Sequence, residues 1–415
     1  MKGKTKKQYI ITIMCILLYS MPLFAQENAV VIKEITLSGL KRTKDEVLLQ
    51  IIEPVKVGGL YTDETKEIII QNLRETGIFV PDIEISTDVI GSDAFITILV
   101  RDKWTLIPIP IFSISKGESW NAGVLTIENN FLGYYKTLGL GFFFGSQGWT
   151  LLSFYSDPYF LQSDFTLTAS LAAGFDEVTD LNVDETLARE YEADKLGLSL
   201  GIEYPLTKRL SLSGTIEYDL WILRNDSPSI IPDINSMGIK SQIGWKDVYY
   251  DIPYEKGLTA QFSASANWEF TGQTFYPVIS SDFQWSFSPW FKHLISLKAV
   301  GGWGRMPVQK QFRLGGLDGS RVLPMDKVAA DEYGTSTIVY NIPLWIFKAG
   351  TISSKVFYEA GYFKSDVTER TFFHGPGIGL EFFINNLAIP AVGLNLGWNL
   401  VTGEMQFSAG IGMSR

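Results

Sequence analysis

Strict alternation of apolar and polar residues is the feature that most constrains the fold of this chain. It sets in near residue 104 and recurs up to the C-terminal end. In one run the apolar positions are Leu258, Ala260, Phe262, Ala264, Ala266 and Trp268, and the polar positions between them are Thr259, Gln261, Ser263, Ser265 and Asn267. Successive side chains of a β-strand point to opposite faces, so such runs predict a sheet with one apolar and one polar face.

The character of these two faces favours a membrane barrel over a soluble sandwich. The polar face carries charges and amides along whole strands, and the apolar face carries large aromatics near strand ends. After the N-terminal segment, no apolar run of the sequence approaches the roughly 20 residues that a membrane-spanning helix needs. The pattern is typical of a barrel with lipid outside and water inside, and lipid requires that the sheet close on itself.

Sixteen alternating runs predict sixteen antiparallel strands. They cover residues 105–115, 120–129, 136–145, 149–156, 164–174, 194–204, 209–222, 236–246, 257–270, 277–287, 293–303, 335–347, 353–363, 375–384, 390–399 and 404–413. If the N-terminus lies in the periplasm, every odd-numbered connection faces outward. The longest gaps, 175–193, 223–235, 304–334 and 364–374, all fall on that side, which supports an even count.

The first 25 residues have the pattern of a secretion signal. A basic segment with four lysines precedes an apolar run from Tyr9 to Leu23, and Ala25 offers a cleavage point. A retained anchor is the alternative, but the run is short for a spanning helix. Cys15 lies inside the segment, so the mature chain would have no cysteine chemistry. Cleavage would change the net charge from −10 to −14, and we expect no nucleic-acid partner.

Residues 26–103 predict a small α+β domain in the order strand, helix, helix, strand, strand. Strands are expected over 30–37, 82–90 and 94–100, and helices from Thr43 and over 63–76. The phrases ITLSGLKRT (35–43) and LRETGIFVPDIEI (73–85) resemble a POTRA domain, the periplasmic module of the BamA/TamA superfamily. Only one copy is present. An unrelated α+β domain is the alternative.

Short turn phrases of the barrel carry the same resemblance. Asn130-Phe131-Leu132-Gly133 and Asp157-Pro158-Tyr159-Phe160 are similar to two turns of the BamA/TamA superfamily, the bacterial surface antigen family, and both fall on the expected periplasmic side. The resemblance implies a bacterial outer-membrane protein in a single-POTRA form. Its parts would be a signal peptide (1–25), a periplasmic POTRA-like domain (26–103) and an all-β transmembrane barrel of sixteen antiparallel strands (104–415).

The strongest phrase, LGGLDGSRVL (314–323), lies in the longest outward gap. The resemblance implies that this segment, with Gly315, Gly316 and Arg321, folds back into the lumen. A lumenal arginine needs an anionic partner. Period two points Glu359 and Glu381 inward, so we expect Arg321 to pair with Glu359, with Glu381 as second candidate; a solvated loop arginine is the alternative.

Three positions of this chain depart from the family's loop pattern. Val322 stands where the family has glycine and Leu323 where it has an aromatic residue, so the tip should differ in backbone shape. The family also tends to have an acid at the position of Val339, which weakens the full transfer of its loop-docking contacts.

The first and last strands predict a weak seam. Pro108 and Pro110 lack the backbone N–H, and two residues apart they would remove donors from the same edge of the first strand. Gly410 and Gly412 leave the short last strand with few side chains. The alternative is that both prolines merely lie in the linker before the barrel.

The resemblance implies a factor that assembles, inserts or translocates proteins, acting through the seam by β-augmentation of client strands. Its partners would be the outer-membrane bilayer, unfolded outer-membrane or secreted clients and periplasmic accessory proteins. We expect no cofactor, metal or enzymatic activity, because the only two histidines, His293 and His374, should lie far apart. A passive pore and a dedicated exporter of one partner are the alternative functions.

Overall fold

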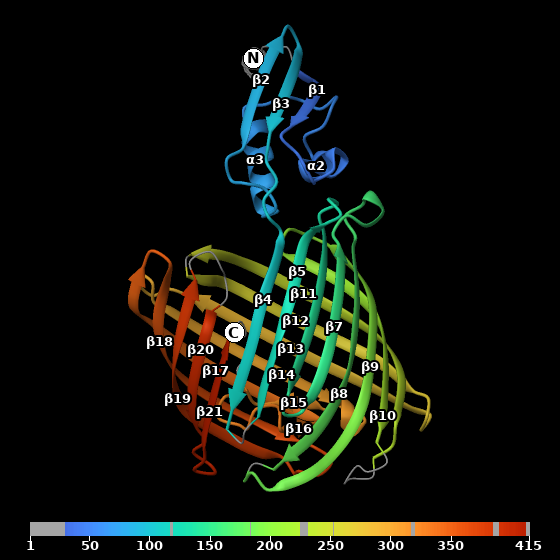
Figure 1. Cartoon of the computed structure of the whole chain (residues 1–415), viewed down its shortest axis with the longest axis vertical. Helices are drawn as coiled ribbons and strands as arrows, with labels where there is room; N and C mark the ends of the chain where they lie inside the picture. The colour runs from blue at the N-terminus through green and yellow to red at the C-terminus, as the bar shows by residue number, and fades with distance from the viewer. Residues whose placement is uncertain are drawn as a thin grey trace, which may run out of the picture. The chain divides into compact units, whose positions relative to one another are not determined.

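The computed structural model describes residues 30–116, 119–182, 184–224, 231–251, 253–316, 320–384 and 390–411. The chain divides into two compact units between Trp104 and Thr105 (Figure 1). The expected signal peptide and Gly412 lie outside the described residues. Among the described residues, no helix has the length and apolar character to cross a membrane.

The first unit has the predicted α+β order. Strand β1 (Val31–Ser38) is followed by helices α2 (Asp45–Ile51) and α3 (Thr65–Glu75) and by strands β2 (Glu84–Ile90) and β3 (Asp93–Leu99). Strand β3 lies in the centre of the sheet, parallel to β1 and antiparallel to β2. Its inward residues and those of the helices form the core: Leu48, Ile69, Leu73, Ala94, Ile96 and Ile98 are almost fully buried.

The carboxylate of Asp102 holds the loop after β1 in place. It accepts hydrogen bonds from the backbone N–H groups of Lys41 at 2.7 Å, Arg42 at 2.8 Å and Thr43 at 3.3 Å, and also from the Thr43 hydroxyl. Burial by itself would raise the pKa of Asp102, but the hydrogen bonds from Thr43, Arg42 and Lys41 together lower it below its ordinary value.

We predict that Asp102→Asn lowers the stability of the first unit by about 1 kcal/mol, a low figure for charged hydrogen bonds because Asp102 is partly exposed. A lowered folded-state pKa stabilises the fold above the unfolded value of about 3.9, and this contribution is lost as pH falls through the folded value. Hydrogen exchange of residues 45–75 in the full-length protein, corrected for intrinsic rates, should therefore show protection that falls below about pH 4 in the native chain. The same acid-dependent loss in the Asp102→Asn variant would contradict this role.

The second unit is a closed barrel of sixteen antiparallel strands, which confirms the predicted fold class. Its strands in chain order are β4 (Leu106–Ser115), β5 (Trp120–Phe131), β6 (Lys136–Gly145), β7 (Gly148–Asp157), β8 (Thr166–Leu181), β9 (Leu187–Pro205), β10 (Leu210–Leu223), β11 (Ile234–Asp251), β12 (Tyr254–Glu269), β13 (Thr274–Phe287), β14 (Leu294–Gly304), β17 (Glu332–Phe347), β18 (Gly350–Lys364), β19 (Thr371–Ile384), β20 (Pro390–Trp398) and β21 (Met405–Ile411). Each pairs with its chain neighbours, and β21 closes the barrel on β4.

Large apolar side chains cover the outside of this barrel. In β12 the outward Phe262 and Trp268 are about half exposed, whereas the inward Ser263 and Asn267 are almost fully buried. Such an exterior requires an apolar solvent, as the alternation predicts. We call the end of the barrel at which β4 begins the proximal end and the opposite end the distal end.

Two of the predicted outward gaps are wrong in their bounds. Residues 175–193 are mostly strand, because β8 continues to Leu181 and β9 begins at Leu187. Residues 304–334 contain a short helix, Val308–Lys310, and a two-stranded ribbon of β15 (Phe312–Leu314) and β16 (Val328–Ala330). Beyond the lipid a strand has no apolar face to maintain, so alternation no longer reports it.

Candidate functional site

Among the described residues, the seam between β21 and β4 has the shortest ladder of the barrel. Register pairs join Ser408 to Ser115, Ala409 to Ile114, Gly410 to Ser113 and Ile411 to Phe112. On its other side β4 pairs with β5 from Leu106 to Ile114. Within the described residues, β21 therefore pairs with only the distal part of β4.

Pro108 and Pro110 belong to β4, so the alternative that they lie in a linker is wrong. The N–H of Ser115 donates toward β5, to the oxygen of Ser119, whereas that of Lys116 donates toward β21, to the oxygen of Phe407. Even-numbered residues of β4 thus direct their backbone groups to the β21 side. Both missing donors therefore belong to the seam edge. At these two positions the edge offers a carbonyl group but no N–H.

The lumenal wall beside the seam is apolar. Ile107, Ile109 and Ile111 of β4 lie on the same face as the inward Ser113, and Ile107 is 39% exposed. Their cross-strand neighbours continue this wall through β7 with Leu125, Ile127, Phe143, Leu152 and Phe154. None of these five is fully buried by the rest of the protein.

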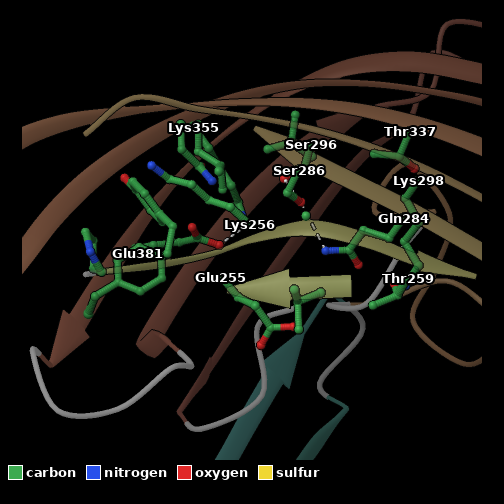
Figure 2. A pocket seen from close by; sticks show the side chains of 18 of the residues that line it. Glu255, Lys256, Thr259, Gln284, Ser286, Ser296, Lys298, Thr337, Lys355 and Glu381 are labelled. Carbon is green, nitrogen blue, oxygen red and sulfur yellow. Dashed lines mark hydrogen bonds and ion pairs between the residues drawn. The ribbon is translucent and has the colours of Figure 1, made fainter. Parts of the chain in front are cut away.

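A polar cavity of about 160 Å³ lies in the other half of the lumen (Figure 2). In the closed strand order, β12 is eight strands from β4, so the two walls face each other across the barrel. The labelled hydroxyl and amide groups in Figure 2 come from β12, β13, β14 and β17. Ser286 lies 2.8 Å from Ser296, hydroxyl to hydroxyl.

Arg321 lies in the lumen and forms a buried ion pair with Glu359 of β18. Its Nη1 lies 2.7 Å from Glu359 Oε1, and the two side chains are 6% and 1% exposed. The N–H of Val322 donates to the second carboxylate oxygen at 3.3 Å, and the guanidinium lies 5.0 Å from the centre of the Phe357 ring. The structure thus brings the predicted pair together and leaves no solvated arginine at this position.

The prediction that Glu381 is a second partner of Arg321 is wrong, because Glu381 pairs with Lys355. Its carboxylate accepts a hydrogen bond from Lys355 Nζ at 2.6 Å, and both residues line the polar cavity (Figure 2). Lys355 is 2% exposed. Lys355, rather than Arg321, therefore neutralises the buried carboxylate of Glu381. Period two also points Lys355 inward, so the sequence offers Lys355 as a second lumenal cation but does not decide which glutamate it pairs with.

The departures of the loop from the family pattern are accommodated by packing. Gly315 and Gly316 have φ of 102° and 104°, and Ser320 is left-handed with φ of 54°, whereas Val322 is not left-handed. The side chains of Val322 and Leu323 are buried in a cluster with Phe357, Phe363 and Phe373, and Val339 packs against it.

Two glycines of the barrel wall form the seat of Val322. A Cβ placed on Gly397 of β20 would lie 2.5 Å from the backbone oxygen of Arg321, and one on Gly375 of β19 would lie 3.2 Å from Val322 Cγ1. The loop backbone approaches the wall so closely that only glycine fits at 397. The sequence did not predict this role of Gly375 and Gly397, because a glycine in a strand does not indicate which residue packs against it.

The family turn phrases form one joined structure at the proximal rim. The side-chain oxygen of Asn130 accepts a hydrogen bond from the N–H of Tyr135 at 2.8 Å, and Gly133 takes a φ of 82° after Phe131. The carboxylate of Asp157, which precedes Pro158 and Phe160, lies 2.9 Å from Nζ of Lys136, the first residue of β6. These contacts join the β5–β6 turn to the end of β7.

His293, the residue before β14, and His374 of β19 each lie beside a tyrosine hydroxyl. His293 Nδ1 lies 2.7 Å from the Tyr340 hydroxyl, and His374 Nδ1 lies 2.7 Å from the Tyr358 hydroxyl. Over the part of the chain that the structure describes, no group of three or more His, Cys, Asp or Glu could hold a metal ion.

Comparison with known families and structures agrees with this architecture. Residues 30–103 match the POTRA model, described as a surface antigen variable number repeat, and residues 130–289 match the Omp85 superfamily domain. No curated protein matches the sequence.

Solved structures share the fold at low identity. The crystal structure of BamA from Haemophilus ducreyi lacking POTRA domains 1–3 is 15% identical, with a TM-score of 0.68 over 92% of this chain and 84% of that one. CdiB from Acinetobacter baumannii is 11% identical, with a TM-score of 0.64 over 92% and 74%. CdiB from Escherichia coli is 14% identical, with a TM-score of 0.64 over 92% and 76%.

Proposed function

Because the chain joins one POTRA domain to an outer-membrane barrel of the Omp85 superfamily, we propose that it inserts or translocates client proteins through the β4–β21 seam. The observation that carries the proposal is the proximal half of β4. Its seam edge keeps the carbonyl groups of Pro108 and Pro110 but lacks their N–H groups. A client strand can donate to this edge but receives fewer bonds in return.

A strand edge that lacks two of its hydrogen-bond donors is suited to binding a client strand transiently. Full β-pairing would hold a client strand as firmly as any barrel strand, whereas a ladder without two donors is weaker and allows release. The apolar side chains of Ile107 and Ile109, which the rest of the protein does not bury, would meet the inward apolar side chains of the incoming segment. Neither step needs a cofactor or covalent chemistry.

Capture of clients at the seam tests this function. A cysteine-directed photo-crosslinker at Ile107 or Ile411 should capture newly made outer-membrane proteins in growing cells. Capture of one secreted protein alone would identify a dedicated exporter. A seam that crosslinks only to itself would favour a passive pore and would refute the proposal. A crosslinker at Phe262, an outward residue on β12, is the control for nonspecific capture.

Restoring the missing donors should strengthen the pairing of a client strand with β4. We predict that Pro108→Ala with Pro110→Ala raises client capture several-fold, because each added N–H can donate to the client strand and contribute about 1 kcal/mol. The matched control is Pro277→Ala on β13, which lies away from the seam. Capture yields that stay equal among the native, double-alanine and control proteins would rule out a role for the prolines.

A further inference from the structure

The β8–β9 hairpin reaches from its own place in the wall to the seam. Its turn is closed by hydrogen bonds from Asn182 N–H to the Thr186 oxygen at 2.9 Å and from Glu185 N–H to the Asn182 oxygen at 3.0 Å. Strands β4 to β7 separate β8 from β21 along the shorter side of the closed order. Contacts of the tip with β21 therefore cross the distal mouth rather than follow the wall.

A buried polar network anchors the hairpin below its tip. Arg189 of β9 donates to Asp180 of β8 at 2.8 Å, to Gln311 beside β15 at 3.0 Å and to Asp366 after β18 at 2.9 Å. Arg313 of β15 also pairs with Asp180 and donates to Tyr191. Asp180 and Arg189 are almost fully buried. Their contacts hold the hairpin against the lumenal loop, residues 305–331, and against the β18–β19 turn.

One residue of the tip contacts both edges of the seam. Glu185 accepts hydrogen bonds from Lys116, the residue after β4, at 2.9 Å, and from Gln406 of β21 at 2.6 Å. Lys116 also donates to Glu404, the residue before β21, at 2.6 Å. These contacts lie at the distal end, whereas the proline edge lies at the proximal end.

The tip residue that makes this contact has a left-handed backbone conformation. Glu185 has a φ of 62°, in the left-handed region that favours glycine. Glycine would relax the turn but would lose every side-chain contact to the seam.

We propose that Glu185 is a clasp that keeps the distal end of the seam closed, so that the β4–β21 seam opens from its proximal end. This inference rests on the proposed function, since it concerns how the same seam opens. Exposed ion pairs such as Lys116–Glu185 are weak and screened by salt. The clasp is therefore reversible, and high salt should loosen it.

Distance measurement between spin labels on the full-length protein in phospholipid vesicles tests the clasp. One label pair, at Phe112 and Ile411, reports the proximal end of the described ladder, and a second, at Ile114 and Phe407, reports the distal end. All four side chains are outward and exposed. In the native protein the proximal pair should show an added longer distance, and the distal pair should show the short distance alone.

Glu185→Gly should give the distal pair the longer distance as well, and Glu185→Gln should do so partly, because glutamine retains an acceptor for Gln406 but no charge for Lys116. Glu177→Gln, on β8 of the same hairpin, is the control and should leave both pairs unchanged. A distal pair that Glu185→Gly does not alter, or native pairs that lengthen equally or not at all, would overturn the clasp. Client capture at Ile107 is measured separately. Capture without an effect of Glu185 would refute the clasp alone, whereas absence of capture would refute the proposed function of the seam.

Discussion

Replacing Arg321 with alanine will release the lumenal loop and destabilise the barrel by about 3–5 kcal/mol, the usual cost of leaving a buried charge without its partner. Glu359 is 1% exposed and pairs with Arg321 at 2.7 Å, so its carboxylate has no route to water while the loop stays docked. The loop should therefore move. Limited proteolysis of residues 305–331 in the folded protein, together with urea unfolding followed by gel shift, measures both effects.

Two controls separate loss of the pair from loss of an arginine. Arg209 pairs with Asp247 at 3.1 Å, but both side chains are about half exposed, so Arg209→Ala should cost no more than about 1 kcal/mol. The double variant Arg321→Met with Glu359→Leu removes both charges and should recover much of the stability. If Arg321→Ala leaves the loop as resistant to protease as in the native protein, the ion pair does not dock it.

The barrel was predictable from sequence because lipid and lumen impose opposite requirements on alternate residues. Period two therefore placed Glu359 on the lumenal face and predicted the sixteen-stranded closed fold. Alternation does not identify the parts of strands that extend beyond the membrane, because no lipid contacts them there. Around Glu177 and Glu192, which are register partners, both strands continue with charged residues on the outward face, and the sequence there has the composition of a loop.

The partners of charged groups were harder to predict than their direction. Period two pointed Glu359 and Glu381 to the same lumen but could not choose between Arg321 and Lys355 as their partners. That choice depends on strand stagger and on how deep the loop enters, which are properties of the closed barrel. The clasp residue Glu185 gave no signal at all, since its contacts with Lys116 and Gln406 join segments far apart in the chain.

Gly397→Ala should displace the same loop without touching its charges. The new Cβ would lie 2.5 Å from the backbone oxygen of Arg321, closer than such atoms approach, so either the loop or β20 must move. Overpacking of this kind costs about 1–3 kcal/mol. Gly214→Ala on β10 is the matched control, because a Cβ there meets nothing within 4 Å. Proteolysis of residues 305–331 should increase in the first variant and not in the second.

Combining Gly397→Ala with Arg321→Ala then tests whether seat and ion pair act as one docking device. If they do, the first change already frees the loop, and the second removes contacts that no longer form. The cost of the double variant should then be smaller than the sum of the single costs by about 1 kcal/mol or more. Strict additivity would mean that Val322 in its glycine seat and Arg321 on Glu359 stabilise the docked loop independently of each other.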